Sequence, residues 1–279
     1  MEEFRESGAQ TRHDVAALFS ALGNDTVERL YALIEEGADV NARHDDDNKR
    51  TALMHASGAG DVEKVCALIE KGADVNACDN DGWTALMFAS GDGGDLARVR
   101  ALIDAGADVN AENQHGWTAL MIASGGGGDV ERVNALIDAG ADVNVPDKDG
   151  KTALMAASGD GGDVERVCAL IEAGTDVNAC DKEGWTALME ASRHGDVERI
   201  FALIEAGADV NACDKHGWTA LMEASRYGDV ERVHALIEKG ADVNYCDSDG
   251  WTALRAAVHH GHAERVNALI EAGANAHDK

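Results

Sequence analysis

The sequence predicts an all-α repeat protein, a helical solenoid from which short β-turn or hairpin fingers project. A TAL triplet recurs with its threonine at Thr51, Thr84, Thr118, Thr152, Thr186, Thr219 and Thr252, at spacings of 33 or 34 residues. A GADVN segment, or a variant of it, begins at Gly37, Gly72, Gly106, Gly140, Gly174, Gly207, Gly240 and Gly273. A fixed period of this length predicts stacked repeats, because one such segment cannot bury its apolar face alone.

Each repeat reads as two short helices followed by a turn. In the repeat from Gly217 to Cys246, Thr219 is placed to cap the first helix and Gly228 to end it. Asp229 is a suitable cap for a second helix, whose apolar residues form a single stripe. Gly240 is placed as a left-handed stop residue, and the Asp-, Asn- and Gly-rich stretch after it is typical of a projecting turn.

This pattern resembles the ankyrin repeat family over nearly the whole chain. The shared residues are G-x-T-A-L-x-x-A, a central Gly, L-I and G-A-D-V-N, repeated in order. The chain departs from the family in having Ala after the Thr in every copy. It also has Met two residues after that Ala in six copies and Arg255 in the last, where the family usually has His.

The uninterrupted register predicts one domain rather than the two that a length of 279 residues would suggest. We expect residues 1–12 to be disordered and residues 13–279 to form a single domain of about eight repeats. The first and last repeats are expected to act as caps. The predicted repeats span 13–45, 46–78, 79–112, 113–146, 147–180, 181–213, 214–246 and 247–279.

The net charge of −28 argues against direct binding to nucleic acid or to an anionic membrane, since phosphate contacts need clustered Lys and Arg. No apolar run approaches the ~18 residues of a membrane helix, and the charged N-terminal segment lacks the apolar core of a signal peptide. Free thiols are expected for all six cysteines, because no CxxC occurs and equivalent positions in stacked repeats lie too far apart to bridge. These features predict a cytoplasmic protein.

No pattern in the sequence indicates catalysis, a metal site or a cofactor. HExxH and GxSxG are absent, and the DNDG and DSDG turns lack oxygen ligands at the first and last positions of a calcium loop. Repeated shallow turns also offer no deep pocket that would exclude water. We therefore expect a non-enzymatic, monomeric protein with a protein partner.

The resemblance implies that a partner binds along a concave face formed by the first helices and the finger bases. All five tryptophans precede the capping Thr and form a stripe there. The residues that the resemblance places on this face are Trp83, Phe88, Trp117, Ile122, Trp185, Glu190, Arg193, His194, Trp218, Glu223, Arg226, Tyr227, Trp251, Arg255 and His259. The face changes from apolar in the N-terminal half to charged and aromatic in the C-terminal half.

Several alternatives remain open from the sequence. The Trp residues could instead cover the neighbouring finger base as part of the scaffold, or sandwich a small flat ligand. The acidic surface could mimic a phosphate backbone and occupy a basic, nucleic-acid-binding partner. The strong similarity among repeats also allows an engineered repeat protein without a natural partner.

Overall fold

A computed structural model describes residues 14–23, 26–45, 48–126 and 128–275 of the 279-residue chain. The segment predicted to be disordered, residues 1–12, lies outside the described residues. The described chain forms two compact units. The first takes in the described residues up to Ala123 and those from 128 to 142, and the second takes in Ser124–Gly126 and the described residues from Val143 onward.

Helices alternate with turns throughout both units, as the sequence predicts. The first unit begins with a helix over residues 14–23, followed by α2 (Val27–Glu35), α3 (Ala52–Ala59), α4 (Val62–Glu70), α5 (Ala85–Ser90), α6 (Leu96–Asp104), α7 (Ala119–Ser124) and α8 (Val130–Asp138). The second unit contains α9 (Ala153–Ser158), α10 (Val164–Glu172), α11 (Ala187–His194), α12 (Val197–Glu205), α13 (Ala220–Tyr227), α14 (Val230–Glu238), α15 (Ala253–His259) and α16 (Ala263–Glu271).

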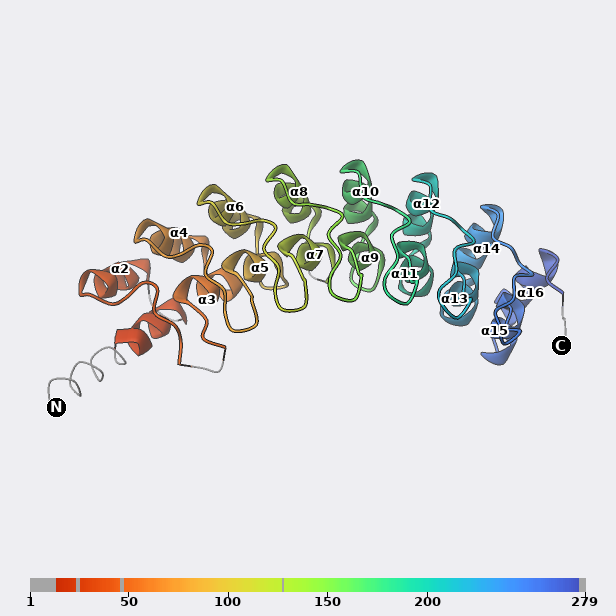
Figure 1. Ribbon diagram of the computed structural model, residues 1–279, viewed down its shortest axis with the longest axis horizontal. Helices are drawn as coiled ribbons and strands as arrows, with labels where there is room; N and C mark the ends of the chain where they lie inside the picture. The colour runs from red at the N-terminus through yellow and green to blue at the C-terminus, as the bar shows by residue number, and fades with distance from the viewer. Residues whose placement is uncertain (1–13, 24–25, 46–47, 127, 276–279) are drawn as a thin grey trace. The chain divides into compact units, whose positions relative to one another are not determined.

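Within each unit the helices form two layers (Figure 1). Odd-numbered helices pack on odd-numbered neighbours, as α3 does on α5 and α11 on α13, while even-numbered helices pack on one another. Small residues permit the close approach of the odd-numbered helices, since Ala191 and Ala224 are fully buried. The Met that stands where the family usually has His also enters the core, with Met189 fully buried and Met54 only 1% exposed.

The helix boundaries follow the capping residues read from the sequence. The Met189 N–H donates to Thr186 Oγ1 over 3.3 Å at the start of α11, and the Arg199 N–H donates to Asp196 Oδ1 over 2.9 Å at the start of α12. The glycine after each even-numbered helix has a positive φ, which is 98° at Gly207. The predicted caps and the left-handed stop are thus confirmed.

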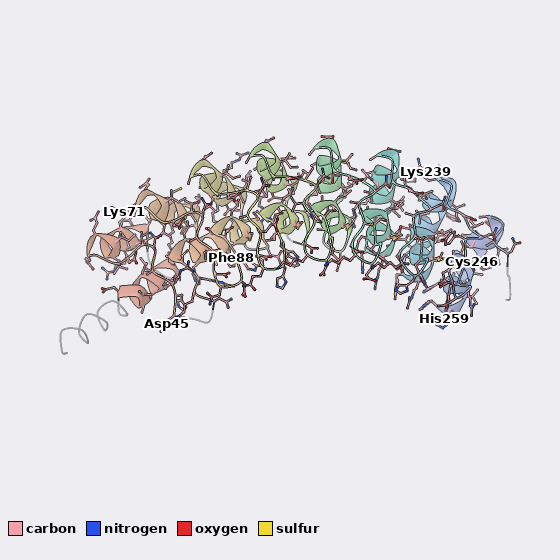
Figure 2. All side chains as sticks on the ribbon, viewed as in Figure 1. Asp45, Lys71, Phe88, Lys239, Cys246 and His259 are labelled. Carbon is pink, nitrogen blue, oxygen red and sulfur yellow. The ribbon has the colours of Figure 1, made fainter. Side chains whose placement is uncertain are left out.

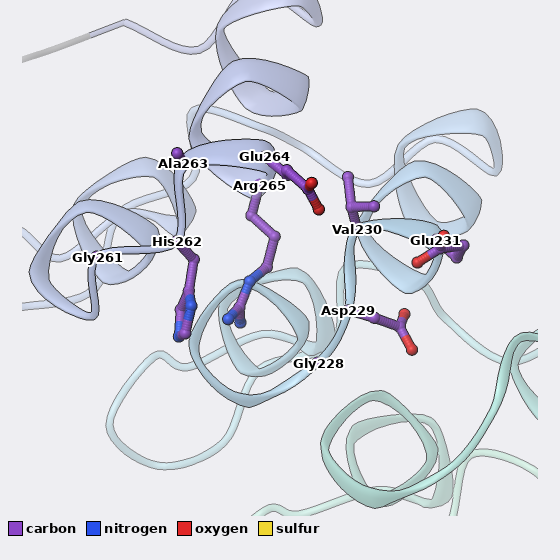
Figure 3. A pocket seen from close by; sticks show the side chains of 9 residues that line it. All are labelled: Gly228, Asp229, Val230, Glu231, Gly261, His262, Ala263, Glu264 and Arg265. Carbon is purple, nitrogen blue, oxygen red and sulfur yellow. The ribbon is translucent and has the colours of Figure 1, made fainter.

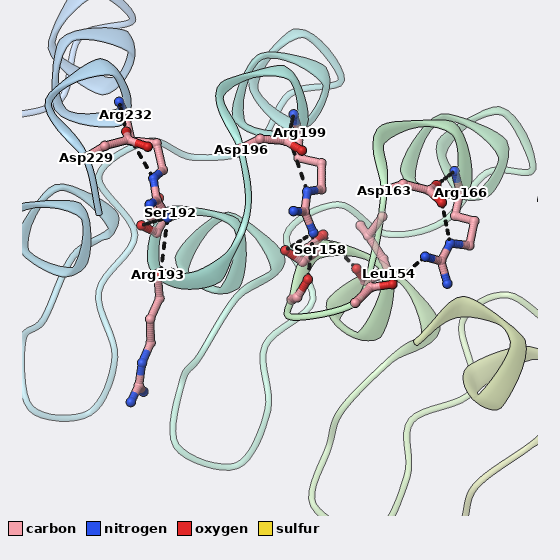
Figure 4. A network of polar contacts seen from close by, with 12 residues as sticks. Leu154, Ser158, Asp163, Arg166, Ser192, Arg193, Asp196, Arg199, Asp229 and Arg232 are labelled. Carbon is pink, nitrogen blue, oxygen red and sulfur yellow. Dashed lines mark hydrogen bonds and ion pairs between the residues drawn. The ribbon is translucent and has the colours of Figure 1, made fainter. Parts of the chain in front are cut away.

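Two sets of hydrogen bonds join successive repeats. The Asn of GADVN links its turn to the next repeat: Asn178 Nδ2 donates to the Gly207 carbonyl over 3.0 Å, and its Oδ1 accepts from the Asp209 N–H over 2.8 Å. A buried Arg near the start of α6, α8, α10, α12 and α16 reaches carbonyls at or near the end of the odd-numbered helix of the preceding repeat. Arg199 Nη1 donates to the Ser158 carbonyl over 3.2 Å and to the Gly159 carbonyl over 2.6 Å (Figure 4).

The projecting fingers carry little β-structure. Isolated antiparallel bridges join Arg43 to Thr51, Cys78 to Thr84, Cys180 to Thr186 and Cys213 to Thr219. Successive fingers are also connected through the backbone, as where the Lys215 N–H donates to the Glu183 carbonyl over 2.8 Å. In the part of the chain that the structure describes, no helix is both long and apolar enough to cross a membrane.

Candidate functional site

The base of each finger fixes the tryptophan that precedes the capping threonine. Asp181 Oδ1 accepts the N–H groups of Glu183 and Trp185 over 2.8 and 2.9 Å. Asp214 Oδ1 makes the same bonds to His216 and Trp218, both over 2.8 Å. Because an Asp side chain accepts both N–H groups of these two turns, the backbone of Trp185 and of Trp218 is held in place, and each half-buried ring precedes an odd-numbered helix.

In the second unit these rings alternate with arginine side chains. The guanidinium carbon of Arg193 lies 5.9 Å from the ring centre of Trp185 and 4.7 Å from that of Tyr227. The guanidinium carbon of Arg226 lies 5.3 Å from the ring centre of Trp218 and 4.7 Å from that of Tyr227. Two arginines from successive odd-numbered helices therefore share one tyrosine, at distances suited to cation–π attraction.

Glu223 lies near these two arginines, and only 4% of it is exposed to solvent. Arg193 Nε is 4.0 Å from Glu223 Oε2, which is too long for a hydrogen bond. Burial raises the pKa of Glu223 to about 7; the charges of Arg193 and Arg226 oppose this rise, and those of Asp214 and Glu190 add to it. The carboxyl group of Glu223 therefore keeps its proton to a higher pH than an ordinary glutamate does.

The same place holds four buried polar atoms that make no hydrogen bond. They are Trp185 Nε1, Arg193 Nε, Arg226 Nε and Glu223 Oε2. Buried polar atoms in folded proteins almost always have a partner, so each unsatisfied one calls for an explanation. We name Trp185, Arg193, Glu223, Arg226 and Tyr227 the arginine–aromatic cluster.

The cluster continues toward the last repeat. The guanidinium carbon of Arg255 lies 4.9 Å from the ring centre of Trp251, and His259 meets that same ring edge-on with centroids 5.4 Å apart. Trp218 and Trp251 are neighbours as well, with centroids 6.2 Å apart. Most of the residues predicted for the C-terminal half of the face therefore lie in one connected group.

The first unit brings together a smaller group. The rings of Trp83 and Phe88 have centroids 5.2 Å apart, and the Arg50 guanidinium carbon lies 4.6 Å from the ring centre of Phe88. Arg50 Nε also faces Asp79 Oδ2 at 3.4 Å, so this arginine already has an acidic partner. Phe88 lies on α5 and His259 at the end of α15 within their respective units (Figure 2).

The remaining predicted residues stand outside these groups. Trp117 is 42% exposed near His115, and Ile122 is half-buried. Glu190 pairs with Lys151 Nζ over 3.7 Å, and His194 is exposed at the end of α11.

Three residues outside the predicted set contact members of it: Arg50, Lys151 and His260. Arg50 and Lys151 occupy the repeat position that Trp holds elsewhere, and this equivalence is the feature of the sequence that points to them. The ring of His260 lies 6.2 Å from that of Tyr227.

A family model of ankyrin repeats, described as three copies, matches residues 13–113, 60–147, 89–179, 125–214, 154–247 and 195–279. The chain belongs to the ankyrin repeat family. Ankyrin repeats generally mediate protein–protein interaction, and a comparison with curated proteins found no match to this chain. The family assignment and the helical repeat fold predicted from the sequence are both confirmed.

Two hollows on this ankyrin repeat protein contain none of the predicted residues. One, of about 350 Å³, is formed where α14 and α16 begin, between Asp229, His262 and Arg265 (Figure 3). Another hollow, of about 510 Å³, is lined by residues of α4 and α6. Neither hollow includes any residue of the arginine–aromatic cluster, and no group of three or more His, Cys, Asp or Glu among the described residues is suited to hold a metal ion.

Proposed function

We propose that the chain is a non-enzymatic scaffold that binds a protein partner along a concave face of its odd-numbered helices, chiefly in the second unit. The observation that supports this proposal is the arginine–aromatic cluster, in which four buried polar atoms have no hydrogen-bonding partner. Trp, Tyr and Arg are also the residue types most enriched among those that dominate binding energy at protein interfaces.

The proposal includes a monomer in which the eight repeats act as one domain, since the repeat register runs without a break through the sequence. All six cysteines are exposed free thiols, which suits a reducing compartment such as the cytoplasm.

Two other functions would give different responses. Mimicry of a phosphate backbone would make affinity fall steeply as salt rises, because many surface charges would act together. A flat ligand held between tryptophans would quench their fluorescence without any protein present. The tilt of 39° between the Trp218 and Trp251 rings is less suited to sandwiching a flat molecule than parallel rings would be.

A pull-down from a native extract tests the proposal. The bait is wild type beside the variant Trp185→Ala/Trp218→Ala/Tyr227→Ala, and the matched control Trp83→Ala/Phe88→Ala/Trp117→Ala removes aromatic rings from the first unit. We expect a protein retained by wild type and by the control to be lost by the first variant, provided that all three baits show a cooperative helical melt. Equal retention by all three would refute a site at the second unit's rings.

A further inference from the structure

We propose that the arginine–aromatic cluster binds the carboxylate of a single Asp or Glu side chain on a partner segment that is otherwise neutral or basic. This inference rests on the proposed scaffold function and specifies the chemistry of the partner.

The unsatisfied atoms match an arriving carboxylate. Three of the four are N–H donors, from Trp185, Arg193 and Arg226, and all are buried without an acceptor. A carboxylate brings two oxygens with several acceptor positions and forms strong charge-assisted bonds to arginine. A neutral amide would satisfy fewer of these donors and would bring no negative charge to the two arginines.

The rings leave the arginines available for such bonds. A guanidinium that stacks on an aromatic face uses its flat surface, so the N–H groups along its edge stay free to donate. The main-chain carbonyl of Arg193 accepts a hydrogen bond from Arg232 Nη1 over 3.1 Å. The Arg193 side chain points away from that bond (Figure 4). The side chain is thus separate from the bonds that hold the repeats together.

Glu223 pairs only loosely with these arginines, since its Oε2 lies 4.0 Å from Arg193 Nε. Its Oε2 accepts no hydrogen bond even though two arginines lie nearby. Its pKa near 7 means that a second carboxylate arriving beside it is accommodated by one proton shared between the two groups. The protonated Glu223 then adds one more donor.

The charged and titratable groups around Glu223 come from several elements. Glu190 and Arg193 face it from α11, Asp214 from the finger, and Arg226 from its own helix. Directly after α15, the ring of His260 lies 6.2 Å from that of Tyr227. Binding of a carboxylate is therefore expected to take up a proton near neutral pH and to be tighter at pH 6 than at pH 8.

The rest of the partner segment is constrained by the net charge of −28. An acidic stretch would be repelled at long range, whereas a neutral or basic segment would be tolerated or attracted. One carboxylate on such a segment can reach the two arginines locally. The first unit does not offer an equivalent site, because Arg50 is already paired with the buried Asp79.

The test follows the indole N–H signal of Trp185 by NMR in the full-length chain. The probes are sodium acetate at constant ionic strength, and a short capped peptide with one glutamate between lysines, compared with its glutamine counterpart. We expect saturable shifts with acetate and with the glutamate peptide, and affinity at least about tenfold weaker for the glutamine peptide. The variant Arg193→Gln/Arg226→Gln should lose the response, while Arg29→Gln/Arg100→Gln, which removes the same charge from exposed arginines, should keep it.

Several results would overturn the inference. Equal binding of the two peptides would remove the role of the carboxylate, and a stronger response to inorganic phosphate than to acetate would assign a phosphorylated partner instead. Absence of any shift in a chain with a wild-type melt would also refute it. In that case a pull-down partner still lost with the Trp185, Trp218 and Tyr227 triple variant would leave the scaffold proposal standing, so the two failures are distinguishable.

Discussion

At the scale of single residues, the same side chain behaves differently in adjacent repeats. Glu190 and Glu223 occupy equivalent positions on α11 and α13, yet Glu190 pairs with Lys151 while Glu223 is buried without a close partner for its Oε2. The preceding repeat explains the difference. The repeat before Glu190 contributes Lys151 and Gly159. The repeat before Glu223 has the larger Trp185 and Arg193 at the same two positions.

This contrast defines how far the sequence predicts the site. The sequence places Trp185, Arg193, Glu223, Arg226 and Tyr227 on one face, because the repeat register fixes which positions are equivalent. It does not predict the burial of Glu223 or the missing hydrogen bonds. Those depend on how the side chains of two neighbouring repeats share space, which no single repeat encodes.

Glu223 makes the stability of the fold depend on pH. Because its pKa in the folded chain is raised to about 7 from 4.5, the folded state binds more protons between these values, and this residue's contribution to stability falls as pH rises through that window. The loss is at most about 3–4 kcal/mol, since one pKa unit corresponds to about 1.4 kcal/mol. We expect Glu223→Gln to stabilise the chain at pH 8 relative to wild type and to give a smaller benefit at pH 5.

Urea unfolding at pH 5, 6, 7 and 8 measures this difference. Glu190→Gln is the matched control, because it makes the same substitution at the equivalent position one repeat earlier. If the difference in unfolding free energy between wild type and Glu223→Gln does not change with pH, or grows as pH falls, the buried carboxyl does not titrate as described.

At the scale of the helices, local rules account for where each element begins and ends. The threonine and aspartate caps and the left-handed glycines follow from side-chain chemistry within one repeat, so the sequence predicts them correctly. The links between repeats are different. The buried arginines read as surface residues of an amphipathic helix, and only the stacked arrangement shows that they reach the odd-numbered helix of the preceding repeat.

The arginine links are expected to contribute strongly to stability. Arg199 is only 6% exposed, and it satisfies the Ser158 and Gly159 carbonyls while its Nε lies 3.3 Å from Asp196 Oδ1. Replacing it by methionine keeps much of the packing volume but removes the donors. We expect Arg199→Met to lower the unfolding free energy by about 2–4 kcal/mol.

The exposed Arg100 on α6 provides the control, since Arg100→Met should change stability by less than about 0.5 kcal/mol. Chemical denaturation of both variants gives the comparison. Similar small effects at the two positions would mean that the carbonyls find other partners and that the arginine link is dispensable.

At the scale of the whole molecule, the chain combines a strongly acidic surface with one positively charged, aromatic cluster. The net charge of −28 arises largely from repeated scaffold residues, including the capping Asp of the even-numbered helices and the Asp of GADVN. The arginines that carry the proposed site belong instead to positions that vary from repeat to repeat. Such variable surface positions are where repeat proteins place their recognition.

The two compact units therefore differ in what they offer a partner. In the first unit, Arg50 lies beside the aromatic pair of Trp83 and Phe88, and it already forms an ion pair with Asp79. In the second, the arginines lie on aromatic rings and leave polar atoms unsatisfied. We therefore propose that the second unit recognises the partner through local contacts rather than through overall charge.

The most direct test is the affinity, by isothermal titration calorimetry, of the captured partner for wild type, Trp185→Ala and Trp83→Ala. Both variants remove a tryptophan from the same repeat position. A difference in affinity between them therefore reports the location of the ring and not the mere loss of one. We expect Trp185→Ala to weaken binding by about 30-fold or more and Trp83→Ala by less than about threefold, as for a central and a peripheral interface residue. Wild-type affinity in Trp185→Ala, or an equal loss in both variants, would contradict recognition by the second unit.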